Sequence, residues 1–215
     1  MCGIVGIVES SGRPVNHSWL EAMNGSIRHR GPDDDGFYVN GPVGLGMRRL
    51  SIIDVGGGQG ALLASILQTY PQARGTLFDL PAVVESARAL LDAAGITDRC
   101  TCVAGDFFRT LPGGGDAYLF KRVIHDWDDP QAQATLTHYR RAMASHGRLL
   151  VMERVLPVGN TSSLGPLDDI TMLVHYGALE RTEAEYHVLL QAAGFTLARI
   201  MPTQAPLSII EGILA

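Results

Sequence analysis

The sequence has few of the features that mark secreted or membrane-bound proteins. It contains three cysteines in 215 residues, an odd number that does not form a disulfide framework. No apolar run approaches the roughly 18 residues that a membrane span needs. The short apolar run at the N-terminus has no basic flank before it, which a secretory signal would require. We therefore expect a cytoplasmic protein without a membrane partner.

Positive charge is also scarce. The 17 lysines and arginines form no cluster, and the formal net charge is −5. A general nucleic-acid binder needs a basic surface, so we expect no nucleic-acid partner. Hydrophobic residues make up 46% of the chain, which suits a folded protein rather than a disordered one.

The chain changes character near residue 54. Before it, the pattern predicts a short strand at 4–8, a helix around 19–27, a turn-rich stretch HRGPDDDG and a hairpin-like segment that ends in LSIID. After it, apolar strands alternate with amphipathic helices. This alternation is typical of an α/β protein with a mainly parallel sheet covered on both faces.

The later part of the chain predicts a regular series of elements. The expected strands cover 50–55, 75–80, 100–104, 117–124 and 148–155, followed by an antiparallel pair at 195–202 and 207–214. The expected helices cover 61–69, 81–94 and 130–145. Thr182 and Glu185 have the spacing of a capping box before one more helix, which Gly194 would end.

A glycine-rich loop, DVGGGQG, follows the strand at 50–55 and opens the next helix. Glycines there let the backbone approach a ligand closely, and the helix N-terminus offers unpaired N–H groups. Gly56, Gly58 and Ala61 also satisfy the dinucleotide fingerprint, and a tight turn without any ligand would use the same glycines. The loop alone leaves these alternatives open.

Three acidic residues stand at the carboxyl ends of successive predicted strands. They are Asp54, Asp79 and Asp106, and Asp79 lies at the distance from the loop where a ribose-binding acid belongs. Each acid could instead cap a helix. Because open α/β sheets bind ligands along this edge, the shared position of all three favours a cofactor site.

Six motifs then occur in the order and spacing of one family: DVGGGQG, FDLP, AGDFF, FKRVIHDWDD, MERVLP and ERTEAEYHVLLQAAGF. From about residue 54 to its end, the chain closely resembles the S-adenosylmethionine-dependent small-molecule O-methyltransferases of the plant caffeate and bacterial polyketide type. The resemblance implies a Rossmann-like domain over 49–215, with a mostly parallel sheet and one antiparallel strand near the C-terminus. Dinucleotide binding becomes a minor alternative.

The resemblance also implies the cofactor-binding residues. Those expected to hold S-adenosylmethionine are Asp54, Gly56, Gly58, Asp79, Leu80, Asp106, Phe107 and Lys121. The two glycines would pack under the methionine part, and Asp79 would hold the ribose hydroxyls. Asp106 and Phe107 would flank the adenine, with Lys121 in the polar surroundings.

The same resemblance implies His125 as the general base, flanked by Glu153 and Glu180. A sulfonium is already an activated methyl donor, so no metal is expected. A phenol has a pKa near 10, whereas histidine titrates closer to neutral pH, and a neighbouring carboxylate fixes its tautomer. We also expect His125 to end a strand at the ligand edge. The expected substrate is a hydroxyl of a small aromatic molecule.

The first 54 residues resemble another family. MCGIVGI, RHRGPDDDGFY and GLGMRRLSIID are, in this order, the opening motifs of the glutaminase domain of asparagine synthetase, a class II glutamine amidotransferase. The resemblance implies that Cys2 is a nucleophile whose own α-amino group acts as base, and that Arg49 binds the glutamine carboxylate. The family's downstream oxyanion-stabilising pair has no counterpart, a loss of about 3 kcal/mol. We therefore expect an inactive, truncated segment at 1–48.

This segment occupies the place where methyltransferases of this type carry a helical region that dimerises and covers the acceptor pocket. Cofactor binding is therefore a firmer expectation than turnover, and a homodimer stays open. The acceptor would also depend on residues such as Met172, His175 and Tyr176, for which core packing is an equal interpretation. The alternatives are a residual glutaminase and a non-catalytic cofactor-binding protein.

Overall fold

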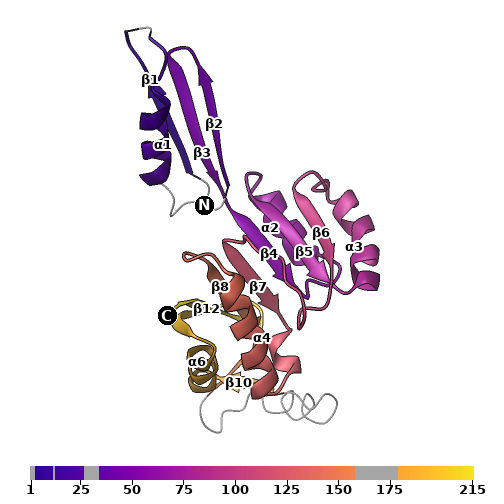
Figure 1. Cartoon of the computed structure of the whole chain (residues 1–215). Helices are drawn as coiled ribbons and strands as arrows, with labels where there is room; N and C mark the ends of the chain where they lie inside the picture. Colours follow the sequence, from indigo (N-terminus) through magenta and orange to yellow (C-terminus); the bar gives the residue numbers. More distant parts are fainter. Residues whose placement is uncertain (1–2, 12, 27–33, 158–178) are drawn as a thin grey trace.

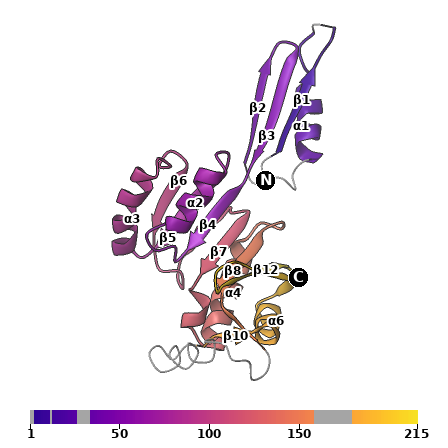
Figure 2. The ribbon, with the colours of Figure 1, turned by 180° about the vertical axis from the view of Figure 1, so that it is seen from behind.

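The computed structural model describes residues 3–11, 13–26, 34–157 and 179–215. The N-terminal part is a small antiparallel sheet in the order β1-β3-β2, formed by β1 (Gly3–Val8), β2 (Asp34–Asn40) and β3 (Val43–Arg49). Helix α1 (His17–Ser26) packs against it through the fully buried Leu20. This unit stands off from the rest of the molecule in two opposite views (Figures 1 and 2).

Leu50 alone separates this unit from the main sheet, because β3 ends at Arg49 and β4 begins at Ser51. The main sheet has seven strands in the order β11-β12-β8-β7-β4-β5-β6. Their bounds are β4 (Ser51–Val55), β5 (Arg74–Asp79), β6 (Cys100–Ala104), β7 (Ala117–Lys121), β8 (Arg148–Glu153), β11 (Phe195–Pro202) and β12 (Ser208–Leu214). Strand β12 runs antiparallel to both of its neighbours, and the other pairs are parallel. The expected Rossmann-like sheet with one antiparallel strand is confirmed.

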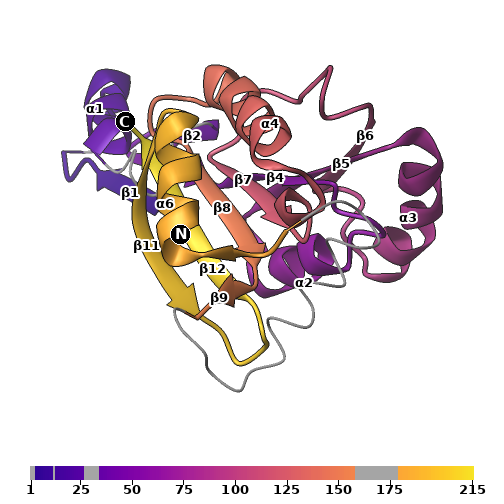
Figure 3. The ribbon, with the colours of Figure 1, turned by 90° about the horizontal axis from the view of Figure 1, so that it is seen from below.

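Helices cover both faces of this sheet (Figure 3). They are α2 (Ala61–Thr69), α3 (Pro81–Ala93), α4 (Asp129–Ala142) and α6 (Glu183–Ala192). Because side chains alternate along a strand, Ile52 joins the core under α2 and α3, whereas Ile53 joins the core under α4 and α6. A two-stranded piece, β9 (Val155–Leu156) and β10 (Arg181–Thr182), completes the described structure.

Local signals place the helix starts as the sequence predicts. Pro81 occupies the first turn of α3, where its missing N–H costs nothing. The capping box is present, because Thr182 accepts a hydrogen bond from the Glu185 amide and donates its own amide to the Glu185 carboxylate.

Two expected boundaries are wrong. The strand predicted at 117–124 ends at Lys121, because Arg122 adopts φ 55°, outside strand geometry. Ile124–Asp126 form a 3₁₀ turn, η2, so His125 lies on a turn and not at the end of a strand. The strand predicted at 148–155 ends at Glu153, and β9 follows separately.

Met172, His175, Tyr176 and Cys2 lie outside the described residues. Within the described ranges, none of the helices has the length and apolar character needed to cross a lipid bilayer.

Candidate active site

The glycine loop is shaped by contacts that only small residues permit. Gly56 and Gly58 adopt positive φ angles of 63° and 60°. A Cβ added at Gly57 would lie 2.5 Å from Leu77 Cδ1 and 2.7 Å from the Asp54 carboxylate. The Gly58 amide donates to Asp79 Oδ2 at 2.8 Å, so the end of β5 holds the loop closed.

Asp54 is a buried acid near the end of β4, just before this loop. Its side chain is 1% exposed, and Oδ2 has no hydrogen-bond partner among the described residues. Burial raises the pKa of Asp54 to about 7; Lys121 opposes this rise, and Asp79 adds to it. A buried carboxylate without a partner is costly, so this oxygen fits a ligand that brings positive charge.

The other two acids of the ligand edge also make local hydrogen bonds. Asp79 Oδ1 accepts from the Leu80 amide at 2.7 Å, and Asp106 Oδ1 accepts from the Phe108 amide at 2.9 Å. The sequence allowed two interpretations of these acids, as helix caps or as ligand-binding residues. The structure shows the local hydrogen bonds, and each carboxylate oxygen retains a second lone pair for a ligand hydroxyl.

Aromatic rings gather beside Asp106. The ring of Phe107 lies 4.6 Å from that of Phe108 and 6.1 Å from that of Trp127, measured between centroids. Lys121, the last residue of β7, is exposed at the same edge of the sheet. An apolar wall and a cation therefore flank the carboxyl ends of the strands.

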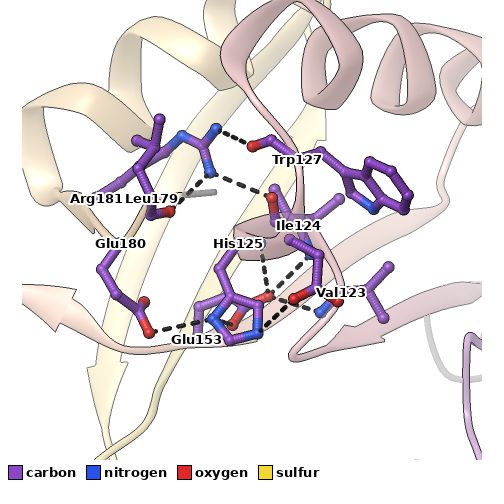
Figure 4. Close-up of polar contacts among 9 residues, drawn as sticks. Val123, Ile124, His125, Trp127, Glu153, Leu179, Glu180 and Arg181 are labelled. Atoms are coloured by element: carbon purple, nitrogen blue, oxygen red, sulfur yellow. Dashed lines mark hydrogen bonds and ion pairs between the residues drawn. The ribbon is translucent and has the colours of Figure 1, made fainter. Parts of the chain in front are cut away.

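The three residues expected to catalyse come together although they are far apart in the chain (Figure 4). Nδ1 of His125 lies 3.1 Å from Glu180 Oε1 and 3.7 Å from Glu153 Oε2. His125 is 3% exposed, and both glutamates are buried. Burial lowers the pKa of His125, but the hydrogen bond that Glu180 accepts from the imidazole and the charges of the nearby carboxylates outweigh burial and raise the pKa above its usual value.

Glu153 has a second contact that the sequence did not predict. Its Oε1 accepts hydrogen bonds from the amides of Val123, Ile124 and His125, at 2.9, 3.0 and 3.4 Å (Figure 4). Burial raises the pKa of Glu153 to about 7, although the charge of His125 and the amides of Val123 and His125 oppose the rise. Glu153 therefore anchors the backbone of the turn, and Glu180 is the nearer partner of the imidazole.

His125, Glu153 and Glu180 also offer ligand-type atoms that lie within 4.8 Å of one another. Such a set can hold a metal ion in other proteins. Here the short contact between Nδ1 and Glu180 is an ordinary hydrogen-bond distance, and one oxygen of Glu153 is occupied by backbone amides. The arrangement is that of an imidazole held by carboxylates.

The other side of the imidazole faces Asp126. Nε2 of His125 lies 3.4 Å from Asp126 Oδ1, and Asp126 is about half-exposed. Burial raises the pKa of Asp126, and His125 and Arg122 oppose the rise. No role for Asp126 was predicted, although it directly follows His125 in the chain.

The structure describes little of the two expected glutaminase residues. Arg49 ends β3 in the N-terminal sheet, and only its backbone is described. Since Cys2 is outside the described residues, the structure gives no geometry for that second site.

The fold and the site define a doubly wound α/β protein with a glycine loop, acids at successive strand ends and a buried histidine with carboxylates. A family model for the O-methyltransferase domain matches residues 46–196, which is most of the chain, and the protein belongs to that family. A model for the glutamine amidotransferase domain matches residues 1–83 and overlaps the first match. The chain therefore joins segments similar to two families.

Curated relatives agree with the family. Phenazine O-methyltransferase PhzM of Lysobacter antibioticus is 47% identical over 161 residues, which are 75% of this chain and 47% of the relative. The mitomycin biosynthesis 6-O-methyltransferase of Streptomyces lavendulae is 41% identical, over 74% of this chain and 46% of the relative. The chain spans about half the length of the curated relatives it matches.

Solved structures agree as well. The crystal structure of LaPhzM superposes with a TM-score of 0.75 at 39% identity, covering 93% of this chain and 58% of the other. The neocarzinostatin O-methyltransferase NcsB1, in complex with S-adenosylmethionine and 2-hydroxy-5-methyl naphthoic acid, gives a TM-score of 0.70 at 34% identity, with 77% and 49% coverage.

Proposed function

We propose that this chain is the catalytic core of an S-adenosylmethionine-dependent methyltransferase that methylates a hydroxyl of a small aromatic molecule. The observation that carries the proposal is the buried His125, whose Nδ1 lies 3.1 Å from Glu180. A histidine with one nitrogen held by a carboxylate can accept a proton at the other nitrogen. The proposal includes a cytoplasmic location, supported by the scarcity of cysteine.

The residues of the glycine loop fit the cofactor. When bound, S-adenosylmethionine supplies a methyl group activated by a positively charged sulfur. Asp54 would offer its unpartnered oxygen to the cationic part of the cofactor, and Gly56 and Gly58 would let the backbone come close. Asp79 and Leu80 would face the ribose. Asp106, Phe107 and Lys121 would complete the site around the adenine.

The chain's own contribution to the reaction would be the transfer of one proton. Nε2 of His125 would take the proton of the acceptor hydroxyl, and the oxyanion left behind is the nucleophile that a methyl group activated on sulfur requires. The imidazolium keeps its Nδ1 proton toward Glu180, whose negative charge stabilises it. Glu153 keeps the turn in place through three backbone amides. Alignment of the acceptor oxygen supplies the rest of the gain.

The acceptor class rests on the relatives. One is named 3-amino-4-hydroxybenzoate 4-O-methyltransferase, and NcsB1 was solved with 1,4-dihydroxy-2-naphthoic acid. Two others are named as N-methyltransferases, of 8-amino-8-demethylriboflavin and of phenazine-1-carboxylate. A general base is needed for a hydroxyl, whose proton must leave, so His125 favours oxygen as the acceptor atom.

The test has two stages. Calorimetry should show that the protein binds S-adenosylhomocysteine, and absence of binding at millimolar concentration contradicts the cofactor assignment. The protein should then methylate 3-amino-4-hydroxybenzoate or 1,4-dihydroxy-2-naphthoic acid, and His125→Ala should not. Phenazine-1-carboxylate, which offers ring nitrogens and no hydroxyl group on its rings, is the comparison, and preference for it would overturn the choice of oxygen. Sedimentation of the same sample tests whether the protein forms a homodimer.

The match of residues 1–83 to an amidotransferase model favours a second origin for the N-terminal part. We propose that residues 1–48 are a glutaminase-derived segment that lacks glutaminase activity. Ammonia release from glutamine is the assay, with Cys2→Ala as the control for the nucleophile. Release by the native protein that Cys2→Ala abolishes would contradict the proposal.

A further inference from the structure

Arg181 directly follows Glu180 in the chain, and the sequence analysis assigned it no role. Its side chain is fully buried and is among the largest fully buried side chains of the described residues. A buried guanidinium is costly unless its N–H groups are satisfied and its charge is paired. The partners of Arg181 therefore indicate what its burial achieves.

The guanidinium binds one carboxylate on helix α4. Nε and Nη2 of Arg181 contact Asp129 Oδ1 at 2.9 and 2.8 Å. Asp129 is the first residue of α4, and its side chain is mostly exposed. The ion pair thus ties the segment before α6 to the start of α4.

The remaining N–H groups go to backbone carbonyls around the catalytic turn. Nη2 donates to Trp127 O at 2.9 Å, and Nη1 donates to Ile124 O at 3.2 Å. These two carbonyls lie on either side of His125 in the chain (Figure 4). Arg181 therefore binds both ends of the turn that carries the histidine.

The same side chain also holds the segment that carries Glu180. Nη1 contacts Leu179 O at 3.5 Å, and the Leu179 amide donates to His125 O at 3.2 Å. The backbone of Arg181, in β10, also pairs with that of Val155 in the neighbouring strand β9. Glu180 therefore lies between the turn at 124–126 and strand β9. Arg181 connects its segment to both, and these connections set the distance between Glu180 and His125.

The geometry points to Arg181 as a positioning residue that sets the contact between His125 Nδ1 and Glu180. Its hydrogen bonds to backbone carbonyls hold the segments that carry these two residues. This role rests on the proposed function, because the contact matters for methyl transfer only if His125 is the base. A misplacement of about 1 Å in such a site can lower the rate by about a hundredfold.

The first experiment uses Arg181→Lys, which keeps the charge but has its three donors on a single atom. That atom cannot span Asp129, Ile124 and Trp127 together. We expect kcat with 3-amino-4-hydroxybenzoate to fall by about ten- to a hundredfold, while the KM for S-adenosylmethionine changes less than about twofold. Arg140→Gln is the matched control, because Arg140 also donates to a backbone carbonyl, that of Gly194, away from His125.

A second readout does not depend on turnover. The Nδ1 proton of an imidazole hydrogen-bonded to a carboxylate gives a downfield proton resonance. The resonance is assigned by its loss in His125→Ala. We expect it to shift upfield or broaden in Arg181→Lys, and to keep its chemical shift and line width in Arg140→Gln. An unmoved resonance and an unchanged kcat in a folded Arg181→Lys protein would overturn the positioning role.

A milder variant covers the case in which Arg181→Lys does not fold. Asp129→Asn, at an exposed position, weakens the ion pair but keeps the three carbonyl contacts, so we expect kcat to fall about threefold with the resonance shifted in the same direction. No change in either readout contradicts the role of Arg181. If the native protein methylates no acceptor, the proposed function fails, and the resonance alone decides whether Arg181 sets the contact.

Discussion

Replacement of Asp54 by asparagine should make the protein more stable at neutral and alkaline pH. The pKa of Asp54 is 3.8 in an unfolded chain and rises to about 7 in the folded protein, because burial disfavours the charged form. The folded state therefore binds more protons than the unfolded state between these values, and stability falls as pH rises from about 4 to about 7. The gap of about three pH units, at about 1.4 kcal/mol each, gives an upper limit of about 4 kcal/mol.

Asparagine removes this loss but adds a buried amide, whose cost of about 1–3 kcal/mol does not depend on pH. The measurement that separates the two is urea unfolding of native protein and Asp54→Asn at several pH values between 4 and 9. The difference in unfolding free energy should grow in favour of the variant up to about pH 7 and then level off. Asp98→Asn, at a side chain that is 77% exposed, controls for the substitution itself.

A difference between Asp54→Asn and native protein that stays constant with pH would refute the reasoning, because it would mean that Asp54 titrates alike in both states. The same variant should bind S-adenosylhomocysteine more weakly, by about tenfold, if Asp54 faces the cofactor's positive charge. A variant that is more stable but binds the cofactor more weakly would show that the native protein keeps a destabilising buried acid for the sake of binding.

Three further predictions concern the rest of the site. The kcat of methyl transfer should fall as pH drops through the pKa of His125, which lies above 6.5, since only the neutral imidazole accepts a proton; a pH-independent kcat contradicts the base assignment. Gly57→Ala should lose about 1–3 kcal/mol of unfolding free energy and most of its affinity for the cofactor, because the added Cβ would lie 2.5 Å from Leu77. Gly113→Ala is the control, since no atom lies within 4 Å of its added Cβ, and it should match the native protein in both measurements. Methyl transfer should survive a chelator, whereas a loss that zinc restores would show that the cluster around His125 holds a metal.

Local patterns along the chain were enough to predict the alternation of elements and the sheet edge at which the three acidic residues gather. Alternating apolar positions and local start signals, such as Pro81 and the Thr182–Glu185 capping box, act within a few residues. The acids at 54, 79 and 106 follow from their places at strand ends, since parallel strands finish at one edge. Their recognition needed no tertiary contact.

The tertiary structure was needed to show how the turn that carries His125 is built. His125 and Glu180 are 55 residues apart, and their contact depends on the packing of β10 and α6 beside the turn. The three amides on Glu153 lie 28 to 30 residues from it, and three of the four partners of Arg181 lie 52 to 57 residues away, so no local pattern encodes these contacts. Most buried polar groups are paired with whatever the packing brings near them, and here a turn at 124–126 stands where the local pattern predicted a strand.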